Sequence, residues 1–229
     1  MDLAAATDLY RKYADDLAAV RDEQRRRLPG IRAQLDDVEA ELTYLRLREL
    51  RPSTVVEIGT FHGWSTTWLL SALRDNGVGR LLSYDVVDHV VRSVPEDLAG
   101  QRWTFTRGDV RTARLPAEID YLFLDAAHSA SFARWYIKAL FGWLAGIPVS
   151  VHDVFHGRRP MPFSEGAVLV RWLTERKIGF FTPSARRAPE TFAALLAVKR
   201  ELGLDEPIRT GRDNPMVFFD LPQGDRRRD

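Results

Sequence analysis

The chain has 229 residues, which is long enough for one α/β domain with a full hydrophobic core and some additional helices. Its net charge of +1 provides no basic field for nucleic acid or a membrane surface, so we expect neither partner. The absence of cysteine excludes disulfides, thiolate metal sites and a thiol nucleophile. No apolar run reaches transmembrane length and no signal-peptide pattern follows Met1, which predicts a cytoplasmic protein.

The first fifty residues carry a helical pattern in two stretches, separated by Pro29-Gly30. In both stretches apolar residues recur at steps of three and four: Leu3, Ala6, Tyr10, Tyr13, Leu17 and Val20, then Ile31, Leu35, Val38, Leu42 and Leu45. Residues 1–50 are therefore expected to form a helical hairpin. We expect it to pack on the main domain as a cap and to supply a homo-oligomer contact, with an active-site lid as the alternative.

From residue 51 to residue 222, strand-like and helix-like segments alternate. Strands are predicted near 54–58, 81–85, 102–107, 119–124, 147–152, 178–182 and 216–220, and helices near 64–75, 129–143, 165–176 and 189–202. This alternation predicts a Rossmann-like, seven-stranded, mostly parallel sheet flanked by helices. The last strand follows Asn214-Pro215 and is expected to be antiparallel, at or near the edge of the sheet. Residues 223–229 are expected to form a flexible tail.

A glycine turn follows the first predicted strand. Glu57, Gly59 and Gly63 lie between the apolar run Thr54–Val56 and a predicted helix that begins at Trp64. Glycines let a ligand approach the main chain, and the helix N-terminus presents backbone N–H groups to it. Because a carboxylate in this turn would repel phosphate, Glu57 points to a ligand that presents a cation or hydroxyl groups.

Polar or acidic residues also end the next four predicted strands. They are Asp85, then Asp109 beside Val110, then Asp125 with His128, and finally His152-Asp153. The carboxyl ends of parallel strands meet at one edge of a sheet, where ligands of such folds bind. An acid at the second strand end is the usual ligand of a ribose diol. We therefore expect these residues to surround one site.

Together these motifs resemble class I S-adenosylmethionine-dependent methyltransferases over residues 51–222. The resemblance implies that the glycine turn passes the methionine part of the cofactor, that Asp85 binds ribose and that Asp109 and Val110 meet adenine. It implies that the residue equivalent to Glu57 is mainly structural and lies near the methionine ammonium. The cofactor-binding residues expected on this basis are Glu57, Gly59, Phe61, Gly63, Ser65, Asp85, Asp109, Val110 and Asp125.

A narrower pattern, Asp125-x-x-His128 followed by His152-Asp153, is similar to metal-dependent O-methyltransferases that modify sugars of natural products. The resemblance implies a divalent metal on the aspartates and a histidine as general base. Here His152 stands where that family has a carboxylate. Magnesium prefers oxygen ligands, so the nitrogen of His152 makes a transition metal an alternative to magnesium on Asp125, His152 and Asp153. A metal-free site is a further alternative.

The same residues suit the chemistry of the methyl transfer that the resemblance implies. A hydroxyl acceptor must lose a proton, and an imidazole such as His128 or His152 can take it. The alternative for His128 is a structural role at the start of the helix that follows Ser129. We expect O-methylation of a small hydroxylated molecule, with N-methylation or a non-methylating cofactor-binding protein as alternatives. A dinucleotide dehydrogenase is disfavoured because the turn lacks the G-x-G-x-x-G pattern.

Overall fold

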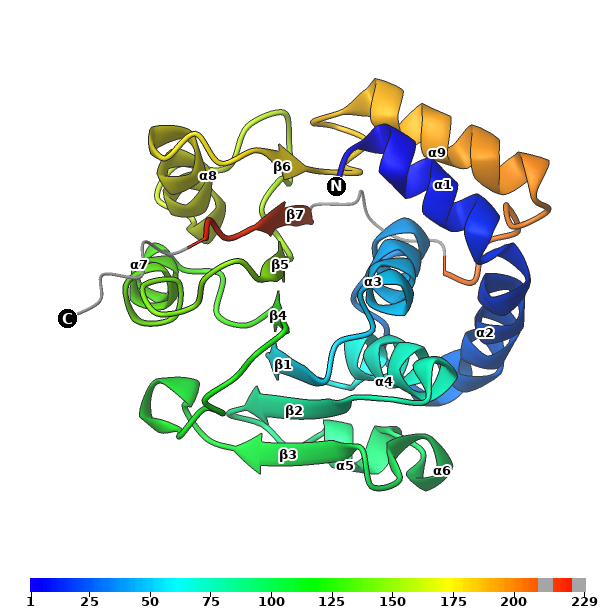
Figure 1. Cartoon of the computed structure of the whole chain (residues 1–229), viewed down its shortest axis with the longest axis horizontal. Coiled ribbons are helices and arrows are strands. Elements are labelled where there is room, and N and C mark those ends of the chain that lie inside the picture. The colour runs from blue at the N-terminus through cyan, green and yellow to red at the C-terminus, as the bar shows by residue number, and fades with distance from the viewer. Residues whose placement is uncertain (210–215, 224–229) are drawn as a thin grey trace.

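The computed structural model of the chain describes residues 1–209 and 216–223. Its centre is a seven-stranded sheet with the order β3-β2-β1-β4-β5-β7-β6 (Figure 1). The strands are β1 Thr54–Ile58, β2 Arg80–Asp85, β3 Trp103–Arg107, β4 Tyr121–Leu124, β5 Pro148–Val151, β6 Phe180–Phe181 and β7 Val217–Asp220. The pairings among β1 to β5 are parallel, and β7 pairs antiparallel with both β5 and β6. The predicted sheet and its antiparallel last strand are confirmed, and β7 lies one strand in from the edge.

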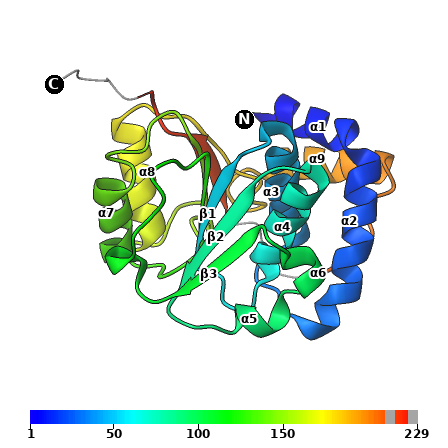
Figure 2. The same ribbon diagram turned by 60° about the horizontal axis from the view of Figure 1, so that its bottom comes forward.

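Helices cover both faces of this sheet. They are α1 Leu3–Lys12, α2 Ala14–Arg27, the 3-10 helix η1 Leu28–Gly30, α3 Asp37–Leu50, α4 Trp64–Asn76, α5 Val90–Ser93, α6 Glu96–Ala99, the 3-10 helix η2 Val110–Thr112, α7 Ala130–Ala139, α8 Glu165–Glu175 and α9 Pro189–Glu201. Helices α7 and α8 lie on one face, whereas α3 and α4 lie on the other, with α1, α2 and α9 outside them (Figures 1 and 2). Both faces of the central strands are therefore shielded from water, which is what their continuous apolar runs require.

The N-terminal segment is a covering layer of the same domain. The break at Pro29-Gly30 forms η1, and the next helix begins at Asp37 rather than at Ile31 because Asp36 caps it. Leucines and tyrosines of α1 to α3 belong to one hydrophobic cluster with residues of β1 and α4. Helix α3 is buried on nearly every side, so residues 1–50 have no core separate from that of the sheet.

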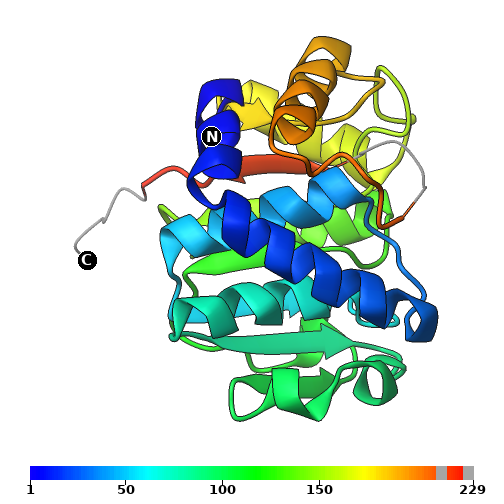
Figure 3. The same ribbon diagram turned by 90° about the vertical axis from the view of Figure 1, so that its right-hand side faces the viewer.

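A buried ionic cluster joins four of these helices, α1, α2, α3 and α9, whose ribbons are seen in Figure 3. The carboxylate of Glu41 on α3 accepts hydrogen bonds from Arg21 of α2 and from Lys199 Nζ of α9, the latter at 2.8 Å. The Tyr10 hydroxyl of α1 donates to the same carboxylate at 2.7 Å. All four side chains are buried, so the cluster fixes how α1, α2 and α9 sit on α3.

Among the described residues, none of the helices has the length and apolar character needed to cross a membrane. The predicted tail at 223–229 lies outside the described residues, apart from Gln223, and so does the pair Asn214-Pro215 before the last strand.

Candidate active site

The glycine turn after β1 is clamped between two neighbouring strand ends. Gly59 has φ +91°, and a Cβ added there would stand 1.9 Å from the carbonyl oxygen of Asp125. On the other side, Asp85 Oδ2 accepts the backbone N–H groups of Thr60 at 2.7 Å and Phe61 at 2.8 Å. Glycine is thus required at position 59 because the ends of β1 and β4 approach too closely for any side chain.

Glu57, near the end of β1, stabilises this turn from the interior of the protein. Its carboxylate is fully buried and accepts hydrogen bonds from the hydroxyls of Ser65 at 2.6 Å, Ser83 at 2.7 Å and Thr66 at 2.9 Å. Burial raises the pKa of Glu57 to about 7, although these hydrogen bonds oppose the shift. Glu57, Gly63 and Ser65 do not line the cavity described next, so their predicted contact with the cofactor has no geometric support.

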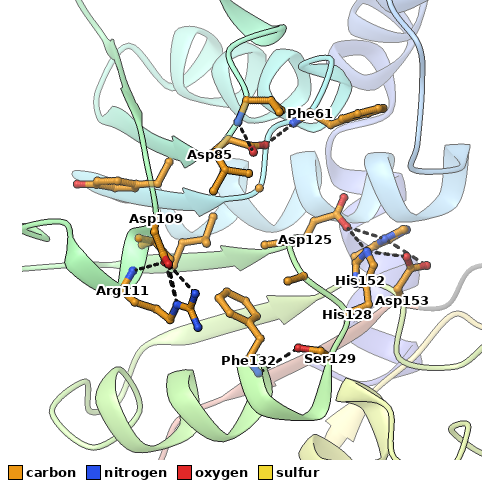
Figure 4. A pocket seen from close by; sticks show the side chains of 18 of the residues that line it. Phe61, Asp85, Asp109, Arg111, Asp125, His128, Ser129, Phe132, His152 and Asp153 are labelled. Atoms are coloured by element: carbon orange, nitrogen blue, oxygen red, sulfur yellow. Dashed lines mark hydrogen bonds and ion pairs between the residues drawn. The ribbon is translucent and has the colours of Figure 1, made fainter.

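A cavity of about 710 Å³ lies at the carboxyl ends of β1 to β5 (Figure 4). Its volume falls within the usual range for small-molecule and cofactor sites, about 300–1,000 Å³. Nine of the predicted site residues line it: Gly59, Phe61, Asp85, Asp109, Val110, Asp125, His128, His152 and Asp153. The parallel sheet therefore brings together five strand ends that are far apart in the sequence, as the strand-end pattern predicted.

Asp85 and Asp109 both have protein partners in this structure. Asp85 holds the glycine turn, as described above, and Asp109 forms a paired ion contact with Arg111, whose Nη2 lies 2.6 Å from Oδ2. The hydrogen bonds from Arg111 lower the pKa of Asp109. Val110, which lies between Asp109 and Arg111 in the sequence, is buried and lines the cavity. The predicted ribose and adenine contacts of these residues stay predictions.

The other end of the cavity holds a cluster of two aspartates and two histidines (Figure 4). His152 Nδ1 lies 3.0 Å from Asp125 Oδ1 and 3.5 Å from Asp153 Oδ1. His128 Nε2 lies 2.9 Å from Asp153 Oδ2 and 3.7 Å from Asp125 Oδ1. Asp153 has φ +57°, a left-handed conformation that aspartate tolerates better than most residues.

Two buried glutamates that the sequence analysis missed stand behind the histidines. Glu39 Oε2 lies 3.2 Å from His152 Nε2, and Glu165 Oε2 lies 3.2 Å from His128 Nδ1. Each belongs to the first turn of a helix, α3 and α8 respectively. The only signal for Glu39 was the pattern Asp36-x-x-Glu39, which is typical of a helix N-terminus and says nothing about a site far along the chain.

The local helix starts explain the position of His128. Ser129 is the N-cap of α7, and its hydroxyl accepts the N–H of Phe132 at 3.2 Å. An isolated bridge joins Ser129 to Ser164, the N-cap of α8, which brings Glu165 next to His128. Since Ser129 caps the helix, the imidazole of His128 is not the cap and faces the carboxylates instead.

The surrounding carboxylates control the charge of both histidines. Burial alone would lower the pKa of His128, but the hydrogen bonds to Asp153 and Glu165 outweigh it and raise this pKa to about 10. In His152 the charges of Asp125 and Glu39 likewise outweigh burial and raise the pKa well above its usual value. His128 is therefore protonated at neutral pH in this arrangement, and it has to lose that proton before it acts as a base.

The cluster also has the composition of a metal site. One ligand atom each from Asp125, His152 and Asp153 lies within 4.8 Å of the others. Their carboxylate oxygens and the Nδ1 atom of His152 converge, whereas the Nε2 atom of His152 points away to Glu39. A neutral His152 that donates its Nε2–H to Glu39 would present a lone pair to an ion between the aspartates, so the residues fit such an ion.

Comparisons with known proteins place the chain in context. Residues 56–154 match the model of a family described as a methyltransferase domain. A comparison with curated protein sequences found no match.

Several solved structures share the fold. One is the O-methyltransferase TomG from Streptomyces achromogenes, involved in tomaymycin synthesis and solved with S-adenosylmethionine (18% identity, TM-score 0.56, 97% of this chain and 89% of that one). Another is a putative O-methyltransferase from Klebsiella pneumoniae (17% identity, TM-score 0.56, 96% of each chain). A third is an O-methyltransferase from Bacillus cereus in complex with S-adenosylhomocysteine (13% identity, TM-score 0.56, 96% of this chain and 99% of that one). Residues 56–154 therefore match a methyltransferase domain, and the chain shares the fold of these solved O-methyltransferases.

Proposed function

We propose that the chain is an S-adenosylmethionine-dependent O-methyltransferase that acts on a hydroxyl of a small molecule, such as a secondary metabolite or a glycoside. The observation that carries this proposal is one cavity with two chemically different ends (Figure 4). The glycine turn, Asp85 and Asp109 lie toward one end, and the carboxylate–imidazole cluster lies at the other. A methyl donor and a hydroxyl acceptor need this adjacency, because the transfer is an in-line displacement.

The cofactor end would hold S-adenosylmethionine. We assign Gly59 and Phe61 to the methionine part, Asp85 to the ribose and Asp109 with Val110 to the adenine, since all of them line the cavity. The Asp85 carboxylate already accepts backbone N–H groups of the turn. In this assignment it would keep these hydrogen bonds and also accept hydrogen bonds from the ribose hydroxyls. Glu57 contributes by holding the turn rather than by contact.

The acceptor end would remove the hydroxyl proton. As the acceptor oxygen attacks the methyl carbon, the carbon–sulfur bond breaks, the sulfonium becomes a neutral thioether, and the hydroxyl proton passes to Nε2 of His128. Glu165 faces the other ring nitrogen of His128 and would stabilise the imidazolium that forms. A general base of this kind contributes about 10²–10⁴-fold to the rate.

We further propose that Asp125, His152 and Asp153 hold a divalent metal ion, either magnesium or a transition metal. When bound, such an ion would orient the acceptor hydroxyl and make it more acidic. His152 is assigned to this ligand set rather than to proton transfer, because its Nε2 faces the buried Glu39 while its Nδ1 faces the two aspartates that would hold the ion.

The remaining assignments concern the setting in which the enzyme works. We propose a cytoplasmic enzyme that forms a homo-oligomer through the outer surfaces of α1 and α2, where charged and polar side chains are exposed. The net charge of +1 supports a small-molecule acceptor rather than a nucleic acid.

Ligand binding tests the central claim. S-adenosylhomocysteine at one hundred times its Kd should add about 2.7 kcal/mol to the free energy of unfolding. For a chain of this length that corresponds to a rise in Tm of roughly 5–10 °C, measured by differential scanning fluorimetry. NAD serves as the control and should leave Tm unchanged. If S-adenosylhomocysteine also leaves Tm unchanged, the proposal fails. If it binds, but a labelled methyl group is transferred to amines and not to hydroxyls, N-methylation replaces O-methylation.

A further inference from the structure

Glu39 reaches the site from the N-terminal helices, far along the sequence from the strand ends that form the cavity. It lies in the first turn of α3, it is 1% exposed, and its Oε2 stands 3.2 Å from Nε2 of His152. Its other oxygen, Oε1, accepts the backbone N–H of Met216 at 2.7 Å. The carboxylate is therefore fixed at both oxygens, and its orientation toward His152 is set by the packing of α3 against the chain that leads into β7.

The contact with Glu39 decides which nitrogen of His152 faces the cavity. With Nε2 directed at Glu39, Nδ1 is left 3.0 Å from Asp125 and 3.5 Å from Asp153. Ligands of one ion at bond lengths of about 2.0–2.2 Å in a tetrahedral site stand roughly 3.3–3.6 Å apart. The spacing of this nitrogen from the two carboxylates is close to that range, and all three residues line the cavity.

We propose that Glu39 is a positioning residue that makes His152 a nitrogen ligand and thereby gives the site a preference for a transition-metal ion over magnesium. The inference rests on the metal assignment within the proposed function. An imidazole nitrogen suits zinc, iron, cobalt or nickel, whereas magnesium takes oxygen ligands. A carboxylate behind a metal-binding histidine fixes the ring and increases its basicity, and loss of such a partner weakens metal affinity by about 10–100-fold.

The competing explanation is that Glu39 serves only the start of α3. Glu39 is the third residue of that helix and forms a capping box with Asp36, so it would stabilise the helix in any case. The two explanations differ in what they predict for the metal. A residue that only caps the helix changes the free energy of unfolding and leaves the metal affinity of the folded protein unchanged.

The experiment is a titration of the full chain with Co²⁺ at fixed pH, followed by its visible absorption, with Mg²⁺ as competitor. The wild type should bind one Co²⁺ with a spectrum of mixed nitrogen and oxygen coordination, and an equal concentration of Mg²⁺ should not displace it. Glu39→Gln should weaken Co²⁺ binding by about 10–100-fold. His152→Ala should lose the nitrogen ligand from the spectrum.

The matched control is Glu49→Gln, the same chemical change on the same helix. Glu49 pairs with Lys12 at 2.6 Å on the outer surface and does not line the cavity, so this variant should bind Co²⁺ as the wild type does. Thermal unfolding shows whether each variant is folded. If Glu39→Gln does not fold, Glu39→Asp takes its place, because it keeps the charge but is one methylene too short to reach Nε2.

Displacement of Co²⁺ by equal Mg²⁺ would overturn the proposal, as would unchanged Co²⁺ affinity in a folded Glu39 variant. Calorimetry with S-adenosylhomocysteine on the same samples separates the two claims. Cofactor binding without Co²⁺ binding would refute the role of Glu39 and leave the methyltransferase assignment intact. Co²⁺ binding that depends on Glu39, without cofactor binding, would support the role of Glu39 and refute the methyltransferase assignment.

Discussion

At the scale of single residues, the site is governed by carboxylates whose roles differ although their chemistry is the same. Glu57 is buried among three hydroxyls and holds a turn, whereas Asp153 is fixed in a left-handed conformation beside two imidazoles. The burial of Glu57 raises its pKa to about 7, and the pairing of Asp153 with His128 holds that carboxyl's pKa well below its usual range although burial opposes this. The environment of each carboxyl group, rather than the residue type, thus decides whether its pKa rises or falls.

Glu57 provides a test of its structural role. Glu57→Ala should lower the free energy of unfolding by about 1–3 kcal/mol, because three buried hydroxyls lose their acceptor. Glu57→Gln should fold and should differ from the wild type in its pH dependence. The folded carboxyl binds its proton more tightly than the unfolded one, so the wild type loses stability as the pH rises through about 7, and the glutamine variant does not. Urea unfolding at several pH values measures both effects, and parallel curves for the two proteins would contradict the assignment.

His128 provides a second test, of its proposed role as the base. Because its pKa is raised to about 10, the fraction of base form should increase as the pH rises above neutrality, and the methylation rate should follow it. Glu165→Gln removes one of the two carboxylates that stabilise the imidazolium, so the rising limb should move to lower pH. Initial rates between pH 6 and pH 10 would show this, with Glu175→Gln, an exposed change on the same helix, as the control. If the methylation rate of Glu165→Gln rises at the same pH as that of the wild type, His128 is not the base.

At the scale of elements, helix α3 connects the outer layer to the active site. One side of it carries Glu39 toward His152, and another carries Glu41 into the cluster with Arg21 and Lys199. Burial is the main reason that the pKa of Lys199 is lowered to about 7, and the charge of Arg21 adds to it. A helix that is polar at such positions is stable only because each charge meets a partner from another element of the fold.

The cluster around Glu41 predicts a large loss of stability on mutation. Glu41→Gln removes the carboxylate that both buried cations, Arg21 and Lys199, contact directly, which should lower the free energy of unfolding by about 3–5 kcal/mol. Chemical denaturation measures this, and Glu49→Gln on the exposed side of the same helix should change it by less than about 1 kcal/mol. Similar values for the two variants would mean that the buried cluster contributes no more than a surface ion pair.

At the scale of the whole molecule, the chain folds as one unit around a shared core. The apolar residues of α1 to α3 pack in the same cluster as those of α4, β1 and β7, and α3 lies directly against α4. The division at residue 50 therefore separates two patterns in the sequence but not two cores.

Removal of residues 1–50 tests this unity. The truncated chain should fail to fold cooperatively, because α4 and the adjoining face of the sheet would expose the apolar surface that α3 covers. Near-UV circular dichroism and thermal unfolding of the truncated protein would show the loss. A sharp unfolding transition with retained binding of S-adenosylhomocysteine would show instead that residues 51–222 form a domain by themselves.

The sequence by itself determined the fold class and most of the cavity. Its apolar runs and glycine turn predicted the strands, and the polar residues at the strand ends predicted which side chains meet, because parallel strands place their carboxyl ends at one edge. The short helices α5 and α6 were missed, since four residues carry too little periodicity to identify a helix. Only the tertiary structure decided that Glu57 is enclosed by hydroxyls and that Glu39 and Glu165 stand behind the two histidines. Those contacts join residues as far apart as 39 and 152, and no local pattern records them, because burial and pairing depend on how helices pack across the sheet.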